Sequence, residues 1–303
     1  MAEFPPTASR VYLPKSASPP RTILAFLVER FPNVDEATWR KRIARGRVTT
    51  ADDGARISGD TPYRHGIHVL YYRDVSSEPA TAEVEQIVYR DDEILVVDKP
   101  HGMVVTPGGS HVKRALLFRL QKSTGLAALA PMHRLDRDTA GLVLFAVKLE
   151  SRGDYHRLFS EGTIEREYFA IAHVRARPDT SEWRVENRLE PGTPWYRQRI
   201  VAGPANALTR IELLELRDGL GLFRLRPGTG RKHQLRVHMA SLGFPILGDR
   251  VYPEIRNSGQ AELPLQLLAK RLAFTDPITG KQHAFVSSRK PPNRSRVSSG
   301  RFQ

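Results

Sequence analysis

One stretch of the chain concentrates ionisable side chains directly in front of an apolar run. PMHRLDRDTAGLVLFAVK, residues 131–148, carries His133, Arg134, Asp136 and Arg137 before GLVLFAV, which is too apolar to be exposed. Charges at the mouth of a buried strand must be paired or functional, because burying an isolated charge is costly. We expect Asp136 to stay ionised between its cationic neighbours, as a nucleophile or a general base requires. A structural ion pair is the commoner role of such a carboxylate, and the residues alone favour it.

A second segment of interest is RPGTGRKHQLRVHMASLGFPILGD, residues 226–249. Its apolar residues recur at helical spacing. We therefore expect a helix that starts at Thr229 or Gly230 and stops at Gly243, ahead of Pro245.

The side chains of this expected helix fall on different faces. Leu235 follows the spacing of core residues, whereas Arg236 and His233 share another face. Arg231 and Lys232 stand near the helix start. An arginine that points toward a cleft can hold a carboxylate or a phosphate, and the alternative is an ordinary basic surface helix.

Two further features are weaker when taken alone. Tyr168 lies in the strand-like run EREYFAIAHV, where tyrosine is a favoured residue without any further role. Residues 89–109, YRDDEILVVDKPHGMVVTPGG, predict a buried strand followed by a glycine-rich turn. This segment has neither GxGxxG nor GxxxxGK[ST], so it gives little support to phosphate binding by a glycine loop.

The composition favours a polyanionic partner. The 303 residues include 47 Lys and Arg against 33 Asp and Glu, which gives a net charge of +14. Such an excess attracts polyanions, of which nucleic acid is the commonest, although a basic proteome background is the plain alternative. The chain has no cysteine, which excludes disulfides, thiolate catalysis and cysteine-ligated zinc.

Residues 21–75 predict a small N-terminal α/β domain. RTILAFLVERF has its apolar residues near helical spacing, and Asp35 is a plausible N-cap for a second helix that ends at Gly46. Short strands are expected at Arg47–Thr50 and Ile67–Tyr72. Basic residues cluster along the second helix and just after it: Arg40, Lys41, Arg42, Arg45 and Arg47. This basic ridge predicts RNA binding, with a solvated charged face as the alternative.

The remaining chain is expected to form one larger domain with simple flanking segments. Residues 1–20 predict a flexible arm, residues 76–86 a linker, and residues 289–303 a basic disordered tail. Residues 87–288 mix strand-like runs with helical stretches, and several strands follow one another without a helix between them. This order favours an α+β fold with a large mixed, mostly antiparallel sheet and flanking helices.

Taken together, three segments resemble the RluA family of pseudouridine synthases. HRLDRDTAGLVLFA is similar to the family's catalytic motif almost position for position, and TGRKHQLRVHMASLGFPILGD is similar to its later motif. DEILVVDKPHGMVV is similar to its opening motif, and the resemblance covers roughly residues 87–286. It implies the pseudouridine synthase fold and the isomerisation of uridine in structured ribosomal or transfer RNA, with no metal or other cofactor. The N-terminal domain resembles the alpha-L RNA-binding module.

The resemblance also implies roles for individual residues. Asp136 corresponds to the catalytic aspartate, and Arg236 to the arginine that pairs with it. Arg134 matches the arginine that fills the gap left by an everted base, and Tyr168 the tyrosine that stacks on the target uracil. Leu235 is expected to give apolar contact beside that base.

Three positions depart from the family pattern. Ala140 replaces a more common serine, and both Leu268 and Asp276 stand where histidine is usual. The change at Ala140 is mild, and we expect the other two departures, which lie away from the proposed carboxylate site, to affect target choice or local packing rather than catalysis.

Two other functions compete with the synthase. One is a non-catalytic RNA-binding or ribosome-assembly protein on the same fold. The other is a metal-dependent hydrolase that uses His133, Asp136, His233 and His238, but this set lacks a known ligand spacing such as HExxH. No apolar stretch approaches the length of a membrane span, and we expect a cytoplasmic monomer that binds RNA.

Overall fold

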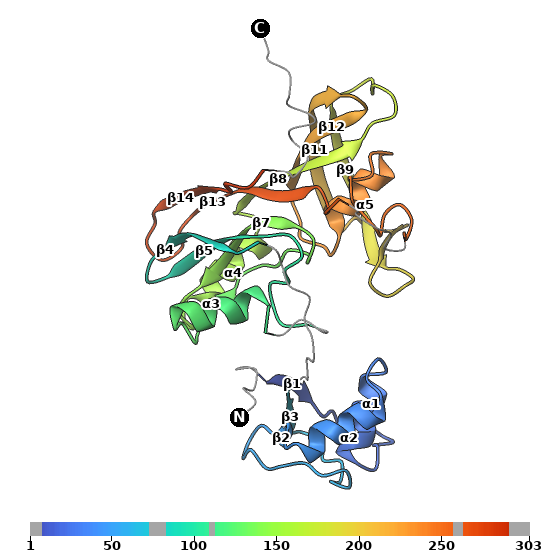
Figure 1. The fold of residues 1–303 in the computed structure, drawn as a ribbon, viewed down its shortest axis with the longest axis vertical. Helices are drawn as coiled ribbons and strands as arrows, with labels where there is room; N and C mark the ends of the chain where they lie inside the picture. Colours follow the sequence, from blue (N-terminus) through green and yellow to red (C-terminus); the bar gives the residue numbers. More distant parts are fainter. Residues whose placement is uncertain (1–7, 73–82, 109–112, 257–262, 291–303) are drawn as a thin grey trace. The chain divides into compact units, whose positions relative to one another are not determined.

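The computed structural model describes residues 8–72, 83–108, 113–256 and 263–290. The chain divides into two compact units (Figure 1). Residues 1–78 with the short segment 108–113 form the N-terminal unit, and the other residues form the catalytic unit.

The N-terminal unit packs two helices with a small antiparallel sheet (Figure 1). Its elements are β1 (Ser9–Tyr12), α1 (Ile23–Arg30), α2 (Glu36–Ala44), β2 (Val48–Thr50) and β3 (His68–Tyr71), and the strand order is β1-β3-β2. The predicted N-cap is confirmed, since the side chain of Asp35 accepts a hydrogen bond from the Thr38 amide (2.6 Å). Leu27 and Trp39 are fully buried at the centre of the unit.

Two expectations for this region are wrong. Ser9–Tyr12 is not part of a flexible arm, because it pairs with β3 and its side chains alternate between half-buried and exposed. Arg42 is not on an exposed ridge: it is only 7% exposed, and its guanidinium lies 4.8 Å from the centre of the Trp39 ring. Arg40, Lys41 and Arg45 are exposed, as expected.

The catalytic unit is built on an 11-stranded sheet. The main strand order is β10-β9-β11-β12-β8-β13-β7-β5-β4, with β14 beside β13 and β6 beside β7. The strands are β4 (Gln86–Arg90), β5 (Ile94–Lys99), β6 (Ala130–Pro131), β7 (Ala140–Ala146), β8 (Glu165–His173), β9 (Glu182–Pro191), β10 (Gln198–Val201), β11 (Ala207–Arg217), β12 (Leu220–Pro227), β13 (Leu267–Thr275) and β14 (Gln282–Val286). The helices are α3 (Leu116–Thr124), α4 (Arg152–Ser160) and α5 (Gln234–Ser241). The predicted α+β fold with a mixed, mostly antiparallel sheet and flanking helices is confirmed.

One parallel contact joins the two halves of the sheet at its centre. β13 runs parallel to β7 through the pairs Leu268↔Ala140 and Ala269↔Gly141, whereas the other strand pairs are antiparallel. Gly141 has φ +113°, and a Cβ atom there would lie 2.2 Å from the carbonyl oxygen of Ala269. Only glycine therefore permits this close approach. The approach fixes the start of β7, just after Asp136.

Apolar side chains cover both faces of the central strands. On β5, Leu95 and Val97 belong to a core with Leu116 of α3, while Ile94 and Val96 belong to a second core that includes residues of α4. Neighbouring residues of a strand point to opposite faces, so one helix packs on each side. A strand covered on both faces reads as a continuous apolar run, which is how ILVVD and GLVLFAV appear in the sequence.

The edges of the catalytic unit reach beyond the predicted boundaries. Glu85, expected in the linker, accepts hydrogen bonds from Arg119 at 2.9 Å. Arg289, expected in the tail, lies 3.3 Å from the fully buried carboxylate of Asp98 and pairs with Glu83. Residues 76–82 and 291–303 lie outside the described residues. None of the helices in the described part of the chain has the length and hydropathy needed to cross a membrane.

Candidate active site

Asp136 lies in the short loop between β6 and β7. The amide of Thr139 donates a hydrogen bond to the carbonyl oxygen of Asp136 (3.1 Å), which closes a tight turn just before β7 begins. The side chain of Asp136 is 30% exposed, so solvent and a substrate can reach its carboxylate. The strand pairing at Gly141 and this turn together set the direction of the carboxylate.

A buried lysine fixes the loop from below. Lys99, at the end of β5, is fully buried, and its Nζ donates to the carbonyl oxygens of Pro100 (2.9 Å), Met103 (2.7 Å) and Arg137 (3.1 Å). Burial lowers the pKa of Lys99 to about 7, although Asp138 and Asp136 act to raise it. Three carbonyl acceptors match the three N–H donors of an ammonium group, so the charged form suits this position. Lys99 thereby ties the turn after β5 to the loop that carries Asp136.

Arg236 of α5 joins Asp136 to a second carboxylate. Its Nη1 donates to Oδ2 of Asp136 at 3.2 Å. Its Nε and Nη2 donate to Oδ2 and Oδ1 of Asp249 at 2.7 and 2.8 Å, in a bidentate pair. The side chains of Arg236 and Asp249 are 7% and 1% exposed. Asp249 is thus the buried anchor of the arginine, and Asp136 is its exposed partner.

The carboxylate of Asp249 is itself held by the backbone. Its Oδ1 also accepts hydrogen bonds from the amides of Val251 (2.8 Å) and Tyr252 (3.0 Å). Gly248, just before it, has φ +78°, and a Cβ atom there would lie 2.5 Å from the carbonyl oxygen of Pro264. Burial acts to lower the pKa of Arg236, but the bonds to Asp249 and Asp136 outweigh this effect and the pKa is raised. The guanidinium is therefore charged at any physiological pH.

His233 reaches the same carboxylate from the start of α5. It has the left-handed backbone angle φ +53°, and its Nε2 lies 3.7 Å from Oδ2 of Asp136. Its Nδ1 lies 3.0 Å from the hydroxyl of Tyr252, and that hydroxyl accepts a hydrogen bond from the amide of Gln198 (2.6 Å). The hydroxyl proton of Tyr252 is then free to bond to Nδ1, which leaves the imidazole proton on Nε2, facing Asp136. Burial lowers the pKa of His233 to about 4 although Asp136 acts to raise it, so the ring is neutral near pH 7.

The start of α5 differs from the expected one. The helix begins at Gln234 rather than at Thr229 or Gly230. The side-chain oxygen of Gln234 accepts hydrogen bonds from the Thr229 hydroxyl (2.7 Å) and the Arg231 amide (3.0 Å). These bonds hold the preceding residues in a turn and delay the helix to the point where His233 and Arg236 both face Asp136.

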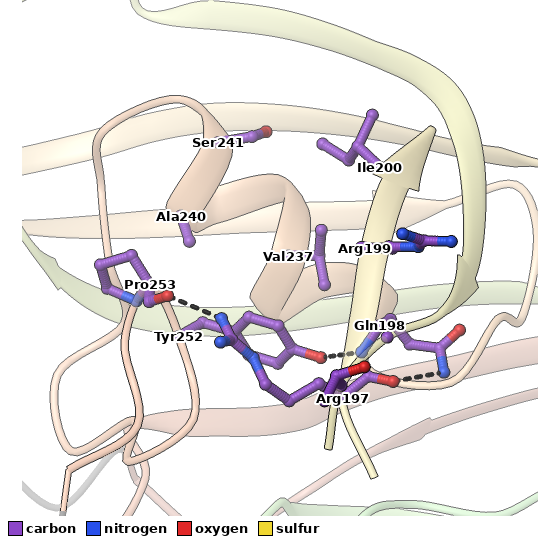
Figure 2. Close-up of a pocket in the computed structure, with 11 residues that line it drawn as sticks. Arg197, Gln198, Arg199, Ile200, Val237, Ala240, Ser241, Tyr252 and Pro253 are labelled. Atoms are coloured by element: carbon purple, nitrogen blue, oxygen red, sulfur yellow. Dashed lines mark hydrogen bonds between the residues drawn. The ribbon is translucent and has the colours of Figure 1, made fainter. Parts of the chain in front are cut away.

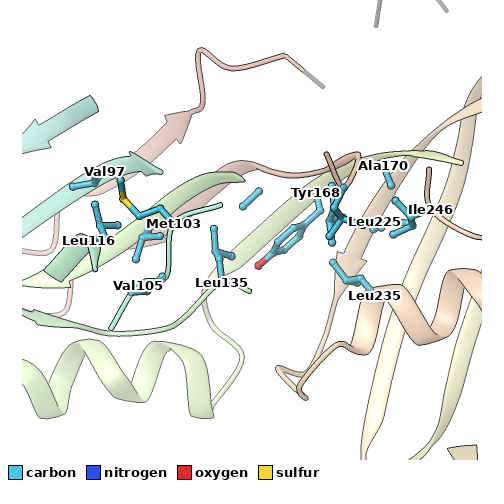
Figure 3. Packing of buried hydrophobic residues seen from close by; sticks show 14 of the residues in the cluster. Val97, Met103, Val105, Leu116, Leu135, Tyr168, Ala170, Leu225, Leu235 and Ile246 are labelled. Atoms are coloured by element: carbon cyan, nitrogen blue, oxygen red, sulfur yellow. The ribbon is translucent and has the colours of Figure 1, made fainter. Parts of the chain in front are cut away.

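Tyr168 and Leu235 supply the apolar side of the site. Tyr168, on β8, is 9% exposed, and Leu235, on α5, is 8% exposed. Figure 3 shows the Tyr168 ring projecting into the core between Leu135 on one side and Leu225 and Leu235 on the other. Burial raises the pKa of Tyr168, so its hydroxyl is neutral at physiological pH. The negative charge of Asp136 also acts to raise this pKa.

The other predicted residues differ in their surroundings. Arg134 is exposed and has no hydrogen-bond partner among the described residues, whereas Arg137 pairs with Asp138 (2.8 Å) rather than with Asp136. Arg231 and Lys232 are exposed. Sequence reasoning assigned no role to Lys99, Asp249 or Tyr252. The sequence offers one signal for Asp249, which is the last residue of the later motif. An arginine held inside a cleft needs a buried anion, and Asp249 is a carboxylate close to Arg236 in the sequence.

Two of the four candidate metal ligands, His233 and Asp136, lie 3.7 Å apart, but His133 and His238 bond to other residues. The ring of His133 stacks on Phe159 (centroid distance 4.7 Å), and its Nε2 accepts a hydrogen bond from the amide of Leu144 (3.1 Å). Burial lowers its pKa to about 3. Within the part of the chain that the structure describes, no group of three or more His, Asp or Glu side chains could hold a metal ion.

Leu268 and Asp276, the two positions where histidine was expected from the family pattern, are both buried. Leu268 is in strand β13, and Asp276, just after it, accepts a hydrogen bond from Tyr155 (2.7 Å).

The structure thus has the two features that the resemblance to pseudouridine synthases implied: a mostly antiparallel sheet, and an accessible carboxylate that pairs with an arginine. The family described as RNA pseudouridylate synthase matches residues 93–241. The chain is 36% identical over 207 residues to the dual-specificity RNA pseudouridine synthase RluA of Escherichia coli K12, which covers 66% of this chain and 90% of that protein. It is also 32% identical over 217 residues to the ribosomal large subunit pseudouridine synthase D of Nitrosomonas europaea, which covers 68% and 62%. The chain is an RNA pseudouridine synthase.

The solved structure of human RNA pseudouridylate synthase domain containing 1 has the same fold. It matches with a TM-score of 0.58 and 24% identity, over 70% of this chain and 86% of that one. The protein therefore belongs to the RluA family of RNA pseudouridine synthases, and its reaction is the isomerisation of uridine to pseudouridine in RNA.

Proposed function

We propose that Asp136 is the group that acts on the ribose of the target uridine. Among the carboxylates around Arg236, Asp136 is the accessible one, because the side chain of Asp249 is 1% exposed and saturated with donors. One oxygen of Asp136 is oriented by Arg236, and the other has no hydrogen-bond partner among the described residues. An oriented, accessible carboxylate with a spare oxygen suits attack on a carbon or removal of a proton.

The reaction leaves the carboxylate unchanged. The bond from C1′ of the ribose to N1 of uracil breaks, a bond from C1′ to C5 forms, C5 loses a proton and N1 gains one. Asp136 can attack C1′ and be displaced when C5 attacks, or it can take a ribose proton, give a glycal and return the proton. Either route balances without an oxidant or a metal ion, so we propose that no cofactor takes part.

The side chains around Asp136 are proposed to receive an everted base. Uridine in stacked RNA hides its glycosidic bond, and turning it out costs a few kcal/mol. Stacking on the Tyr168 ring would return about 1–3 kcal/mol, with Leu235 as an apolar neighbour. Arg134, exposed beside the site, is proposed to fill the gap that the base leaves in the RNA.

The substrate we propose is structured ribosomal or transfer RNA, and the large ribosomal subunit is specified in the name of the Nitrosomonas relative. Contact with phosphates is supported by the net charge of +14 and by five exposed basic side chains: Arg40, Lys41, Arg45, Arg231 and Lys232. We propose that the N-terminal unit is an RNA-binding module of the alpha-L type. A cytoplasmic location and a monomeric state stay predictions.

The test is the variant Asp136→Asn. We expect it to form no pseudouridine in total RNA from a strain that lacks this gene, while its affinity for that RNA stays within about threefold of wild type, since one hydrogen bond is altered. Asp138→Asn, which changes the neighbouring exposed carboxylate, is the matched control and should keep activity. Pseudouridine formation by Asp136→Asn would refute the catalytic role. If RNA from the gene-deletion strain and from wild type contained pseudouridine at the same positions in the same amounts, a non-catalytic RNA-binding protein would be favoured.

A further inference from the structure

One pocket of the structure is lined mostly by residues to which the proposed reaction assigns no role. It has a volume of about 370 Å³ and lies between α5 and β10. Figure 2 shows Val237 and Ala240 on the helix side, Ile200 on the strand side, and Tyr252 and Arg197 at one end. We call it the hairpin pocket, because β9 and β10 form a hairpin. Its walls are apolar and its volume suits one nucleobase with part of its ribose.

A single aromatic ring connects the hairpin pocket to the catalytic site. The guanidinium carbons of Arg197 and Arg236 lie 5.3 and 5.4 Å from the centre of the Tyr252 ring. The hydroxyl of Tyr252 bonds to His233, which faces Asp136. Tyr252 is therefore shared by the wall of the pocket and by the residues that surround the catalytic carboxylate.

Arg197 and Arg199 are among the residues that line the pocket, and Lys232 lies over the ring of Trp195 in the hairpin loop. Arg197, Arg199 and Lys232 have no carboxylate partner among the described residues. Elsewhere on the same hairpin the charges are matched, as in the pair between Arg184 and Glu186 at 2.6 Å. Unpaired cations around an apolar cavity favour an anionic ligand that also has an apolar part.

The loop of the hairpin carries an exposed tryptophan next to these cations. Trp195 is 73% exposed, and the ammonium group of Lys232 lies 5.2 Å from the centre of its ring. A large aromatic ring on the surface loses the hydrophobic stabilisation of burial unless something covers it. Aromatic rings interleaved with basic residues are the pattern by which proteins hold single-stranded nucleic acid, with bases stacked on the rings.

We propose that the hairpin pocket and Trp195 bind a single-stranded stretch of the substrate RNA next to the target uridine. One base enters the pocket, the next stacks on Trp195, and the phosphates between them meet Arg199 and Lys232. The position of this stretch next to the target uridine rests on the proposed function, which places that uridine at Asp136. The nucleotide site itself depends only on the hairpin and α5.

The first experiment uses Trp195 as its own probe. The full-length protein is titrated with an oligouridylate of about ten nucleotides, which is within the site sizes of single-strand binders. Of the three tryptophans, Trp39 is fully buried and Trp183 half-buried, so stacking should quench mainly Trp195. Trp195→Phe should bind and lose the quenching, whereas Trp195→Ala should bind about 5- to 150-fold more weakly.

Two further variants test the pocket and its charge. Ile200→Trp places a large side chain at the pocket wall and should weaken binding by a similar factor, because the base loses its space. Arg199→Ala should lower the slope of log affinity against log salt by about 0.7, the value for one phosphate contact on a single strand. Arg184→Ala, on the same hairpin but paired with Glu186, is the control and should bind like wild type.

The outcomes separate this proposal from its competitors. Unquenched Trp195 at saturation, or binding within twofold of wild type for Trp195→Ala and Ile200→Trp, would overturn it. Equal binding of an oligoglutamate of the same length, with the same dependence on these residues, would show a general anion or protein surface and also overturn it. Asp136→Asn should bind the oligouridylate normally. If Asp136→Asn is active, the proposed function of Asp136 is wrong, but the proposal of the nucleotide site is unaffected.

Discussion

The buried pair of Arg236 and Asp249 allows the sharpest test of how the catalytic site is held. In Asp249→Asn one carboxylate oxygen becomes an NH₂ group. Oδ1 accepts from three donors and Oδ2 only from Nε of Arg236 (2.7 Å), so the amide would keep its oxygen on the Oδ1 side. The new NH₂ then faces the Nε–H of Arg236, donor against donor. The arginine, 7% exposed, keeps its charge and loses its anchoring anion.

The expected cost is large because the charge stays buried. Breaking a buried ion pair by removing one partner costs about 3–5 kcal/mol. For a domain of roughly 150–250 residues, each kcal/mol shifts the melting temperature by about 2–4 °C, so Asp249→Asn should melt about 6–20 °C lower. We expect kcat to fall about 100-fold as well, because Arg236 no longer fixes Asp136 and a misplacement of about 1 Å has that effect.

Thermal unfolding and single-turnover pseudouridine formation measure the two effects. Glu165→Gln is the matched control: it makes the same chemical change in an ion pair with Arg271 whose side chains are 73% and 37% exposed. Exposed pairs contribute about 0–1 kcal/mol, so this variant should melt within a few degrees of wild type. Should Asp249→Asn melt no lower than Glu165→Gln and keep its kcat, the anchoring role assigned to Asp249 would be wrong.

Four other outcomes are expected. His233→Leu should lower kcat about tenfold with little change in RNA affinity, because it removes the Nε2–H that faces Asp136, and equal losses in both would point to a fold defect. Lys99→Met should cost about 3 kcal/mol or more in urea unfolding, because three carbonyls, two of them buried, lose their donor, and an unchanged midpoint would contradict the loop-clamp role. Burial lowers the pKa of His238 to about 4, so between pH 6.5 and 4 the unfolded chain binds more protons at this residue; the stability lost between pH 7 and 4.5, measured by urea unfolding, should be about 2–3 kcal/mol smaller in His238→Asn than in wild type. Lys41→Ala should reduce the salt slope of RNA binding by up to about 1, and an unchanged slope would argue against the basic ridge.

The sequence predicts best what local patterns determine. The N-cap at Asp35 and the buried apolar strands within residues 94–98 and 141–147 follow from neighbouring residues, and both are confirmed. Local pattern fails where a distant group decides the conformation. Arg42 looks like a member of an exposed ridge but packs on Trp39, and α5 starts late because Gln234 holds the turn before it. Neither outcome can be read from helical spacing.

The candidate site shows the same division. The charges of Asp136 and Arg236 stand out in the sequence, and the structure brings them together across 100 residues at 3.2 Å. The support beneath them was not predicted. Lys99 is an ordinary lysine in the sequence, and only the folded chain brings its ammonium group to three carbonyl oxygens, one of them in the loop that carries Asp136.

The two carboxylates that share Arg236 explain why one is proposed as reactive and the other is not. Asp249 accepts four hydrogen bonds, two from the guanidinium and two from backbone amides, in a side chain that is 1% exposed. Each bond occupies a lone pair of its oxygens and blocks their approach to another atom. Asp136 accepts one bond at 3.2 Å and is 30% exposed. Arg236 therefore uses two N–H groups to bind Asp249 and one to orient Asp136. Asp136 is held in position while one of its oxygens keeps no hydrogen-bond partner among the described residues.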